Sequence, residues 1–146
     1  MIFTEPGREG RSCLQTIAYP FLLLQNCRGE KLLYQRTEGP VLESEQYGKV
    51  PAVKTFASYN EEKGEVKVFA LNLTQEEANL SVCIPAFRKL RLIKRAVYQG
   101  NLSDKNVCGS EPCGIVRTIE DTALEDGCGT VCVHPYSLTM FVFSVK

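Results

Sequence analysis

The sequence lacks several features that mark common functional classes. Seventeen basic residues balance seventeen acidic ones, so neither a nucleic-acid partner nor an acidic tail is indicated. No glycine-rich phosphate-binding loop is present. No apolar segment follows a positively charged start, as it would in a signal peptide, and the apolar run at residues 18–24 is too short to cross a bilayer. We therefore expect neither nucleic acid nor a membrane as a partner.

The composition is that of an ordinary soluble globular protein. Of 146 residues, 44% are hydrophobic and 23% are charged, and this length suits one domain with an appendage. The cysteines number seven, which is odd. Because no export signal is visible, we expect reduced thiols and a cytoplasmic location. A disulfide between Cys113 and Cys128 is the alternative if the chain is exported.

Residues 12–27 have the pattern of a helix. Ser12 suits the N-cap, and Gln15 follows three residues later, as in a capping box. Pro20 lies inside the pattern and is expected to kink it. Because a single helix ahead of a strand-rich chain has little to pack on, we interpret it as the end of a larger unit. Its apolar residues recur at helical spacing and form one stripe: Leu14, Ile17, Phe21 and Leu24.

After this helix the period changes to that of strands. The polar turn at residues 60–64 joins two runs rich in β-formers, 50–59 and 65–73, and predicts a hairpin. The other expected strands are 31–35, 39–45, 78–84, 90–98, 114–119, 128–133 and 136–145. Short strands without intervening helices predict a mostly β protein, an antiparallel sandwich of jelly-roll type. The expected core members are Phe56, Phe69, Leu71, Val82, Leu92, Leu138 and Phe141.

An ordered series of motifs resembles one enzyme family from end to end. Residues 4–7 (TEPG) and 15–21 (QTIAYPF) resemble the last barrel loop and helix of intracellular α-L-arabinofuranosidases, glycoside hydrolase family 51. Residues 28–29 resemble the Gly-Arg-Gly that follows that helix, and 50–51, 57–66 (ASYNEEKGEV) and 69–72 (FALN) resemble the central hairpin. Residues 101–106 and 111–112 are similar to the linker before the closing strands, and 134–139 (HPYSLT) to the final strand.

The resemblance implies both an architecture and a missing active site. Family members have a (β/α)8 barrel followed by a jelly-roll sandwich. Residues 1–30 would be a remnant of the last barrel loop and helix, and residues 31–146 the C-terminal sandwich domain. The acid/base and nucleophile glutamates of this retaining glycosidase family lie on earlier barrel strands, so no catalytic residue and no cofactor is assigned here. The chain departs from the family at residues 8–13 (REGRSC) and at Leu73.

The expected function follows from that architecture. We expect an accessory sandwich of an α-L-arabinofuranosidase, which breaks down arabinan and arabinoxylan, and we expect it to be inactive alone. Its expected partner is the catalytic barrel of the same enzyme, and arabinose-containing polysaccharide would be bound only indirectly. A homo-oligomer is a further expectation, because family members often form hexamers. Whether the chain is itself an enzyme stays open.

Few of the acidic residues are candidates for the catalytic carboxylates of a glycosidase. Retaining hydrolysis needs two carboxylates about 5–5.5 Å apart. Most acids here fall in predicted turns, where solvated charge is the ordinary interpretation. Glu5 is the exception, since it lies in the segment that resembles a barrel loop, near where the active face of a barrel would be.

Two alternative functions depend on other residues. Cysteine pairs with short spacers suggest a structural zinc site and a zinc-stabilised interaction domain: Cys108, Cys113, Cys128 and Cys132. A free-standing carbohydrate-binding sandwich would use aromatic side chains as a stacking platform: Tyr34, Tyr47, Tyr59 and Tyr98. The single histidine, His134, is two residues from Cys132, but no third group that would orient a nucleophilic pair is evident.

Overall fold

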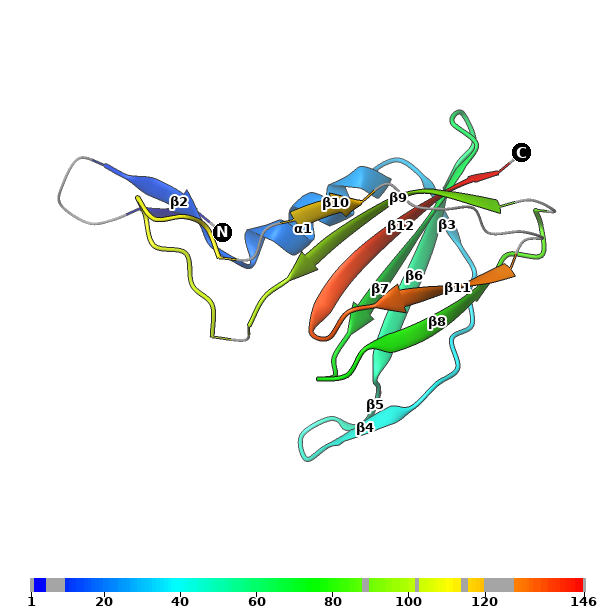
Figure 1. Ribbon diagram of the computed structural model, residues 1–146, viewed down its shortest axis with the longest axis horizontal. Coiled ribbons are helices and arrows are strands. Elements are labelled where there is room, and N and C mark those ends of the chain that lie inside the picture. Colours follow the sequence, from blue (N-terminus) through cyan, green and yellow to red (C-terminus); the bar gives the residue numbers. More distant parts are fainter. Residues whose placement is uncertain are drawn as a thin grey trace.

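An antiparallel sheet is the centre of the molecule (Figure 1). The computed structural model describes residues 2–4, 10–87, 90–101, 103–113, 116–119 and 128–145. In this part of the chain the main sheet has the strand order β10-β9-β12-β7-β6-β3. These strands are β10 (Val116–Ile119), β9 (Leu90–Gln99), β12 (Ser137–Val145), β7 (Glu65–Asn72), β6 (Val53–Asn60) and β3 (Lys31–Leu33).

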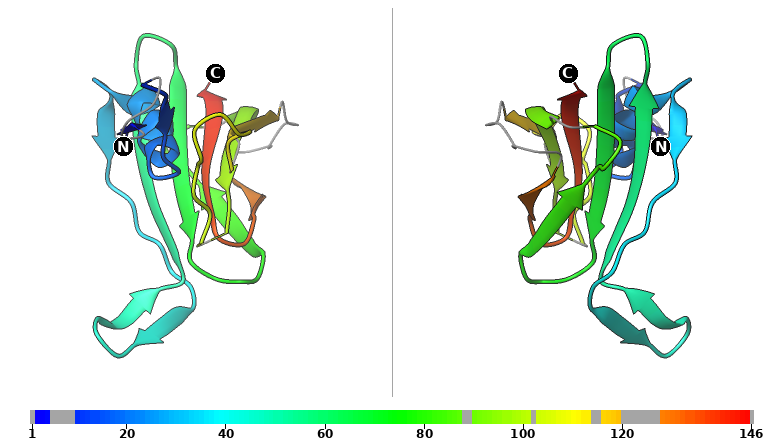
Figure 2. Two further views of the ribbon diagram at one scale, coloured as in Figure 1. Left: turned by 90° about the vertical axis from the view of Figure 1, so that its left-hand side faces the viewer. Right: turned by 90° about the vertical axis from the view of Figure 1, so that its right-hand side faces the viewer.

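A second layer covers one face of this sheet. Strands β8 (Ala78–Cys83) and β11 (Cys128–Val133) pair with each other and lie against the main sheet (Figure 2). The core between the two layers includes Phe141 and Phe143 from β12 and Val133 from β11, all fully buried. Two sheets that bury their apolar faces against each other form a sandwich. The predicted mostly β, antiparallel, sandwich-like fold is therefore confirmed.

The other face of the main sheet carries the helix. Helix α1 (Ala18–Leu24) continues into a short 3₁₀ turn, η1 (Gln25–Cys27). Leu23 is 3% exposed and packs with Phe69 and Met140 of the sheet. Phe56 stacks on Phe69 with ring centroids 4.2 Å apart. The expectation that the helix has little to pack on is wrong, because strand residues on the face away from β8 and β11 are also apolar and the helix covers them.

The start of the helix also differs from the prediction. Residues Ser12–Leu14 form strand β2, which pairs with β1 (Ile2–Thr4), so Ser12 hydrogen-bonds Thr4 at 3.0 Å instead of capping a helix. The N-cap position is Ile17, without a side-chain cap. Pro20 therefore lies in the first turn, where a missing N–H costs no intrahelical bond. No kink is needed there.

The predicted central hairpin is confirmed with one change. Strands β6 and β7 pair from Val53↔Asn72 to Asn60↔Glu65, and Asn60 Oδ1 accepts a hydrogen bond from the Lys63 N–H at 3.0 Å in the turn. The expected strand 50–59 is interrupted at buried Ala52, whose backbone bonds Pro40 and Leu73 instead. The residues before it form β5 (Gly48–Pro51), which pairs with β4 (Val41–Ser44) as a separate hairpin.

The predicted core residues are divided between the two faces of the main sheet. Val82, Leu92 and Phe141 belong to the core between the sheets. Phe56, Phe69 and Leu138 lie on the helix side, and Leu71 is half-buried on the wall of a pocket there. No helix among the described residues has the length and apolarity to span a membrane.

Candidate docking surface

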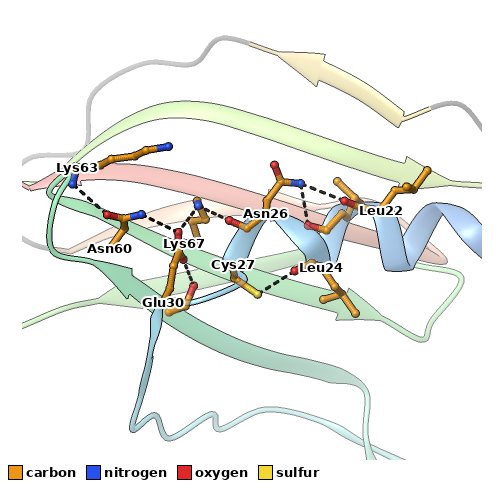
Figure 3. Close-up of polar contacts among 10 residues, drawn as sticks. Leu22, Leu24, Asn26, Cys27, Glu30, Asn60, Lys63 and Lys67 are labelled. Carbon is orange, nitrogen blue, oxygen red and sulfur yellow. Dashed lines mark hydrogen bonds and ion pairs between the residues drawn. The ribbon is translucent and has the colours of Figure 1, made fainter.

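A buried ion pair fixes the end of the helix to the sheet (Figure 3). Lys67 of β7 pairs with Glu30, which follows η1, and their side chains are only 8% and 4% exposed. The Lys67 ammonium also donates to the Asn26 carbonyl at 2.5 Å. The general expectation that acids are solvated therefore fails for Glu30. An isolated lysine in the otherwise apolar run of β7 was the signal in the sequence.

Hydrogen bonds satisfy the Glu30 carboxylate. Ser58 donates to Oε2 at 2.6 Å, and Asn60 donates to Oε1 at 3.3 Å. Burial by itself raises the pKa of Glu30, but the hydrogen bonds from Lys67, Ser58 and Asn60 and the charge of Lys67 together outweigh it, so that the pKa lies below its ordinary value. Glu30 is therefore ionised at neutral pH and has a structural role.

A second buried polar side chain holds the N-terminal segment. Asn106, 7% exposed, donates to the Leu14 carbonyl at 2.5 Å and to the Tyr19 hydroxyl at 3.3 Å, and its Oδ1 accepts from the Cys113 N–H at 2.8 Å. The backbone carbonyl of Asn106 accepts a hydrogen bond from the side-chain amide of Gln15 at 3.1 Å. The ring of Tyr19 stacks on Tyr98 of β9 at 5.3 Å. The β1–β2 hairpin and the start of α1 are thus fixed to the rest of the fold.

The N-terminal segment that is fixed in this way exposes many large apolar side chains. Leu23 faces the sheet, but the other side of α1 is uncovered. Large apolar side chains that are exposed together on a protein surface are typical of interaction sites. We name the following set the N-terminal apolar surface: Ile2 (70% exposed), Phe3 (47%), Leu14 (42%), Ile17 (59%), Phe21 (50%) and Leu22 (44%). Three of the four residues of the predicted stripe belong to it.

An apolar pocket of about 400 Å³ opens between α1 and the main sheet. Pro20 and Leu24 of α1 form one wall, and Phe56, Leu71 and Leu138 of the sheet form another. Its lining contains no carboxylate, so it has no group for glycosidic acid–base chemistry.

Exposed glutamates line a second cavity. A cavity of about 600 Å³ between the β4–β5 hairpin and the start of β8 is lined by Glu38, Glu76 and Glu77, and all three are exposed. A general acid needs an enclosed apolar environment that raises its pKa. Glu38 instead pairs with Arg36 at 2.6 Å on the surface. Glu5 lies outside the described residues.

The four cysteines of the predicted zinc set are not brought together. Cys108 contacts the Phe3 carbonyl at 3.8 Å and Cys113 the Lys105 carbonyl at 3.6 Å, both next to the N-terminal segment. Cys128 lies opposite Cys83 across the β8–β11 pair. Cys132 lies at the other end of β11.

Cys132 and His134 have a third neighbour that the sequence did not reveal. Glu77 Oε2 lies 3.7 Å from His134 Nδ1, and the ligand atoms of Glu77, Cys132 and His134 all lie within 4.8 Å of one another. Burial, followed by the hydrogen bond and charge of Glu77, raises the pKa of Cys132 to about 11. The thiol is therefore protonated at neutral pH, unlike an activated nucleophile.

The four tyrosines do not share one platform. Tyr59 packs against Phe87 at 5.3 Å, and Tyr98 stacks on Tyr19. Tyr34 and Tyr47 are 97% and 73% exposed. Tyr34 follows β3, whereas Tyr47 is in the turn of the β4–β5 hairpin, which projects from the opposite end of the molecule (Figures 1 and 2).

The fold matches solved α-L-arabinofuranosidases over nearly its whole length. The family 51 enzyme from Thermotoga petrophila RKU-1 matches with a TM-score of 0.80 and 17% identity over 97% of this chain and 31% of that one. The enzyme from Thermotoga maritima, solved with arabinose, gives a TM-score of 0.78 and 14% identity over 95% of this chain and 30% of that one. At these identities the likeness shows a common fold.

Sequence similarity points the same way. The chain is 31% identical over 108 residues to an exo-α-(1→6)-L-arabinofuranosidase from Bifidobacterium longum. The chain resembles the C-terminal region of family 51 α-L-arabinofuranosidases. No family model matches it. The aligned residues are 72% of this chain but only 20% of the relative, so the match corresponds to a domain of a larger protein.

Proposed function

We propose that this chain is the accessory C-terminal sandwich of an α-L-arabinofuranosidase and that it packs on a catalytic (β/α)8 barrel. The N-terminal apolar surface carries the proposal, because six large apolar side chains in residues 2–22 are exposed on a segment that buried polar residues fix in place. A fixed apolar surface is typical of a permanent interface. Substrates of the whole enzyme would be terminal α-L-arabinofuranosides.

In this proposal the chain is inactive alone. Among the described acids, Glu30 forms a buried ion pair with Lys67. The glutamates that line the cavity beside the β4–β5 hairpin are exposed. The reactive pair of carboxylates would be supplied by the barrel. The division into a barrel remnant (residues 1–30) and a sandwich (31–146), the cytoplasmic location and the homo-oligomer stay predictions.

A chimera tests the docking role. The matched region of the Bifidobacterium longum relative is replaced by this chain, and hydrolysis of an aryl α-L-arabinofuranoside is measured. We expect an active chimera, and we expect Phe21→Glu, in the N-terminal apolar surface, to lower its activity and melting temperature. Leu32→Glu is the matched control, because Leu32 is 77% exposed on β3, outside that surface. A folded but inactive chimera, or equal effects of the two substitutions, would contradict the proposal.

The exposed Tyr34 and Tyr47 favour a carbohydrate-binding module as the second candidate. Calorimetry with arabinan and arabinoxylan oligosaccharides separates the two functions. The docking proposal predicts no heat of binding to the isolated chain at millimolar sugar. Binding that Tyr34→Ala or Tyr47→Ala abolishes would support the module instead.

A further inference from the structure

One end of the β8–β11 pair gathers three different metal-ligating side chains. The two strands are antiparallel, with Val133 opposite Ala78, so the next residues outward, His134 and Glu77, also face each other. Cys132 lies two residues before His134 and therefore points to the same side. As a result, thiol, imidazole and carboxylate ligand atoms lie within 4.8 Å of one another. It is the one group of three such side chains among the described residues that is close enough to share an ion.

We propose that Glu77, Cys132 and His134 form a site for a divalent zinc-like metal ion. Zinc binds cysteine, histidine and carboxylate ligands at about 2.0–2.3 Å, which places tetrahedral ligands about 3.3–3.7 Å apart. Glu77 Oε2 and His134 Nδ1 are already 3.7 Å apart. The Glu77 side chain is 56% exposed, so it has room to rotate toward an ion. Three protein ligands leave a fourth position open for water.

The backbone that carries these ligands is held by one buried side chain. Asn72 at the end of β7 is fully buried, and its amide donates to the carbonyls of Glu76 at 2.7 Å, His134 at 3.1 Å and Val133 at 3.3 Å. The Asn72 side chain therefore links the segment before β8 to the segment after β11. Ser137 Oγ also donates to the His134 carbonyl at 2.7 Å. Such prior ordering lowers the entropic cost of binding an ion.

The ligand types select among metals. A thiolate and an imidazole favour zinc and cobalt and disfavour magnesium and calcium, which prefer oxygen ligands. Binding replaces the thiol proton of Cys132 with a metal–sulfur bond and releases that proton to solvent, without any change of oxidation state. The site is independent of the proposed docking function, because it lies on the β8–β11 layer and not on the N-terminal apolar surface.

Cobalt titration of the full chain under a phosphine reductant tests the site. We expect one Co²⁺ per chain, a thiolate-to-cobalt charge-transfer band and the visible bands of a tetrahedral ion, all reversed by added Zn²⁺. Cys132→Ser should remove the charge-transfer band. We expect His134→Ala to weaken binding at least tenfold, and Glu77→Gln to weaken it less.

Two controls make the result specific. Cys128→Ser and Cys108→Ser alter other members of the cysteine set and should leave the cobalt spectrum and affinity unchanged. Circular dichroism melts establish that each variant is folded. Absence of a thiolate band in the wild-type chain, an unchanged affinity in His134→Ala, or loss of the band in Cys108→Ser would each overturn the proposal.

Discussion

The ammonium group of Lys67 lies against the carboxylate of Glu30 in the interior, where neither side chain is more than 8% exposed. This pair joins the segment after the helix to a central strand of the sheet. A buried pair of this kind is weak evidence for net stability, since both charges lose their hydration. Removing one partner, however, leaves the other charge buried and uncompensated.

We therefore predict that Glu30→Gln destabilises the chain by about 3–5 kcal/mol at pH 7. The double variant Glu30→Gln/Lys67→Met should recover much of this loss, because no charge is then left unpaired. Urea denaturation monitored by circular dichroism measures both variants. Equal destabilisation of the single and double variants would show that the ion pair is not the cause.

The same pair predicts a pH dependence. Because the folded pKa of Glu30 is lowered, its contribution to stability is present above its ordinary value of about 4.5 and is lost as the pH falls through the folded pKa. The wild-type free energy of unfolding should decrease in acid more steeply than that of Glu30→Gln. Denaturation series between neutral pH and pH 3 measure the difference. If the free energies of unfolding of the two proteins changed in parallel with pH, Glu30 would not be the source of the pH dependence.

Asn106 should control the order of the N-terminal segment. Asn106→Ala leaves the Leu14 carbonyl and the Cys113 N–H without their partners, at a cost of about 1–3 kcal/mol. Hydrogen exchange should accelerate in β1, β2 and at Cys113 and remain slow in β7 and β12. Asn101→Ala, an exposed change in the same loop, is the control. Uniform acceleration across the main sheet would indicate global destabilisation instead.

Cys83 and Cys128 should form a disulfide on oxidation. They are directly opposite in the β8–β11 pair, and both are exposed. Glutathione disulfide would accept the two electrons, so that the chain loses two hydrogen atoms and two glutathione thiols are released. Mass spectrometry should find this link in the wild-type chain and not in Cys83→Ser. A dominant Cys113–Cys128 link would contradict the pairing register of β8 and β11, which places Cys83 opposite Cys128.

The sequence predicted those parts of the fold that local pattern determines. The alternating runs and the 60–64 turn specify the β6–β7 hairpin, and the apolar run at residues 136–145 specifies β12. The helix start was misjudged because Ser12 and Gln15 satisfy a capping rule locally, whereas the pairing of Ser12–Leu14 with Ile2–Thr4 is a contact between distant residues. Intrinsic signals of this kind yield to tertiary pairing.

The candidate sites were harder to predict from the sequence than the fold, because they depend on contacts between residues that are distant in the chain. The stripe of Leu14, Ile17 and Phe21 was visible in the sequence, and the structure shows that these side chains are exposed. The approach of Glu77 to His134 follows only from the register of β8 against β11. Burial of Glu30 follows only from the position of the helix over β7. The approach of Glu77 to His134 leaves no spacing in the sequence that could be recognised, and the burial of Glu30 is signalled only by the lysine in the apolar run of β7.

Hydrolysis of an aryl α-L-arabinofuranoside by the purified chain tests the central claim most directly. If the catalytic carboxylates belong to a separate barrel and this chain is only a scaffold, the rate of hydrolysis should equal that of buffer alone. Glu76→Gln and Glu77→Gln should then leave the rate unchanged. Turnover that co-purifies with the chain and is abolished by either substitution would contradict the account.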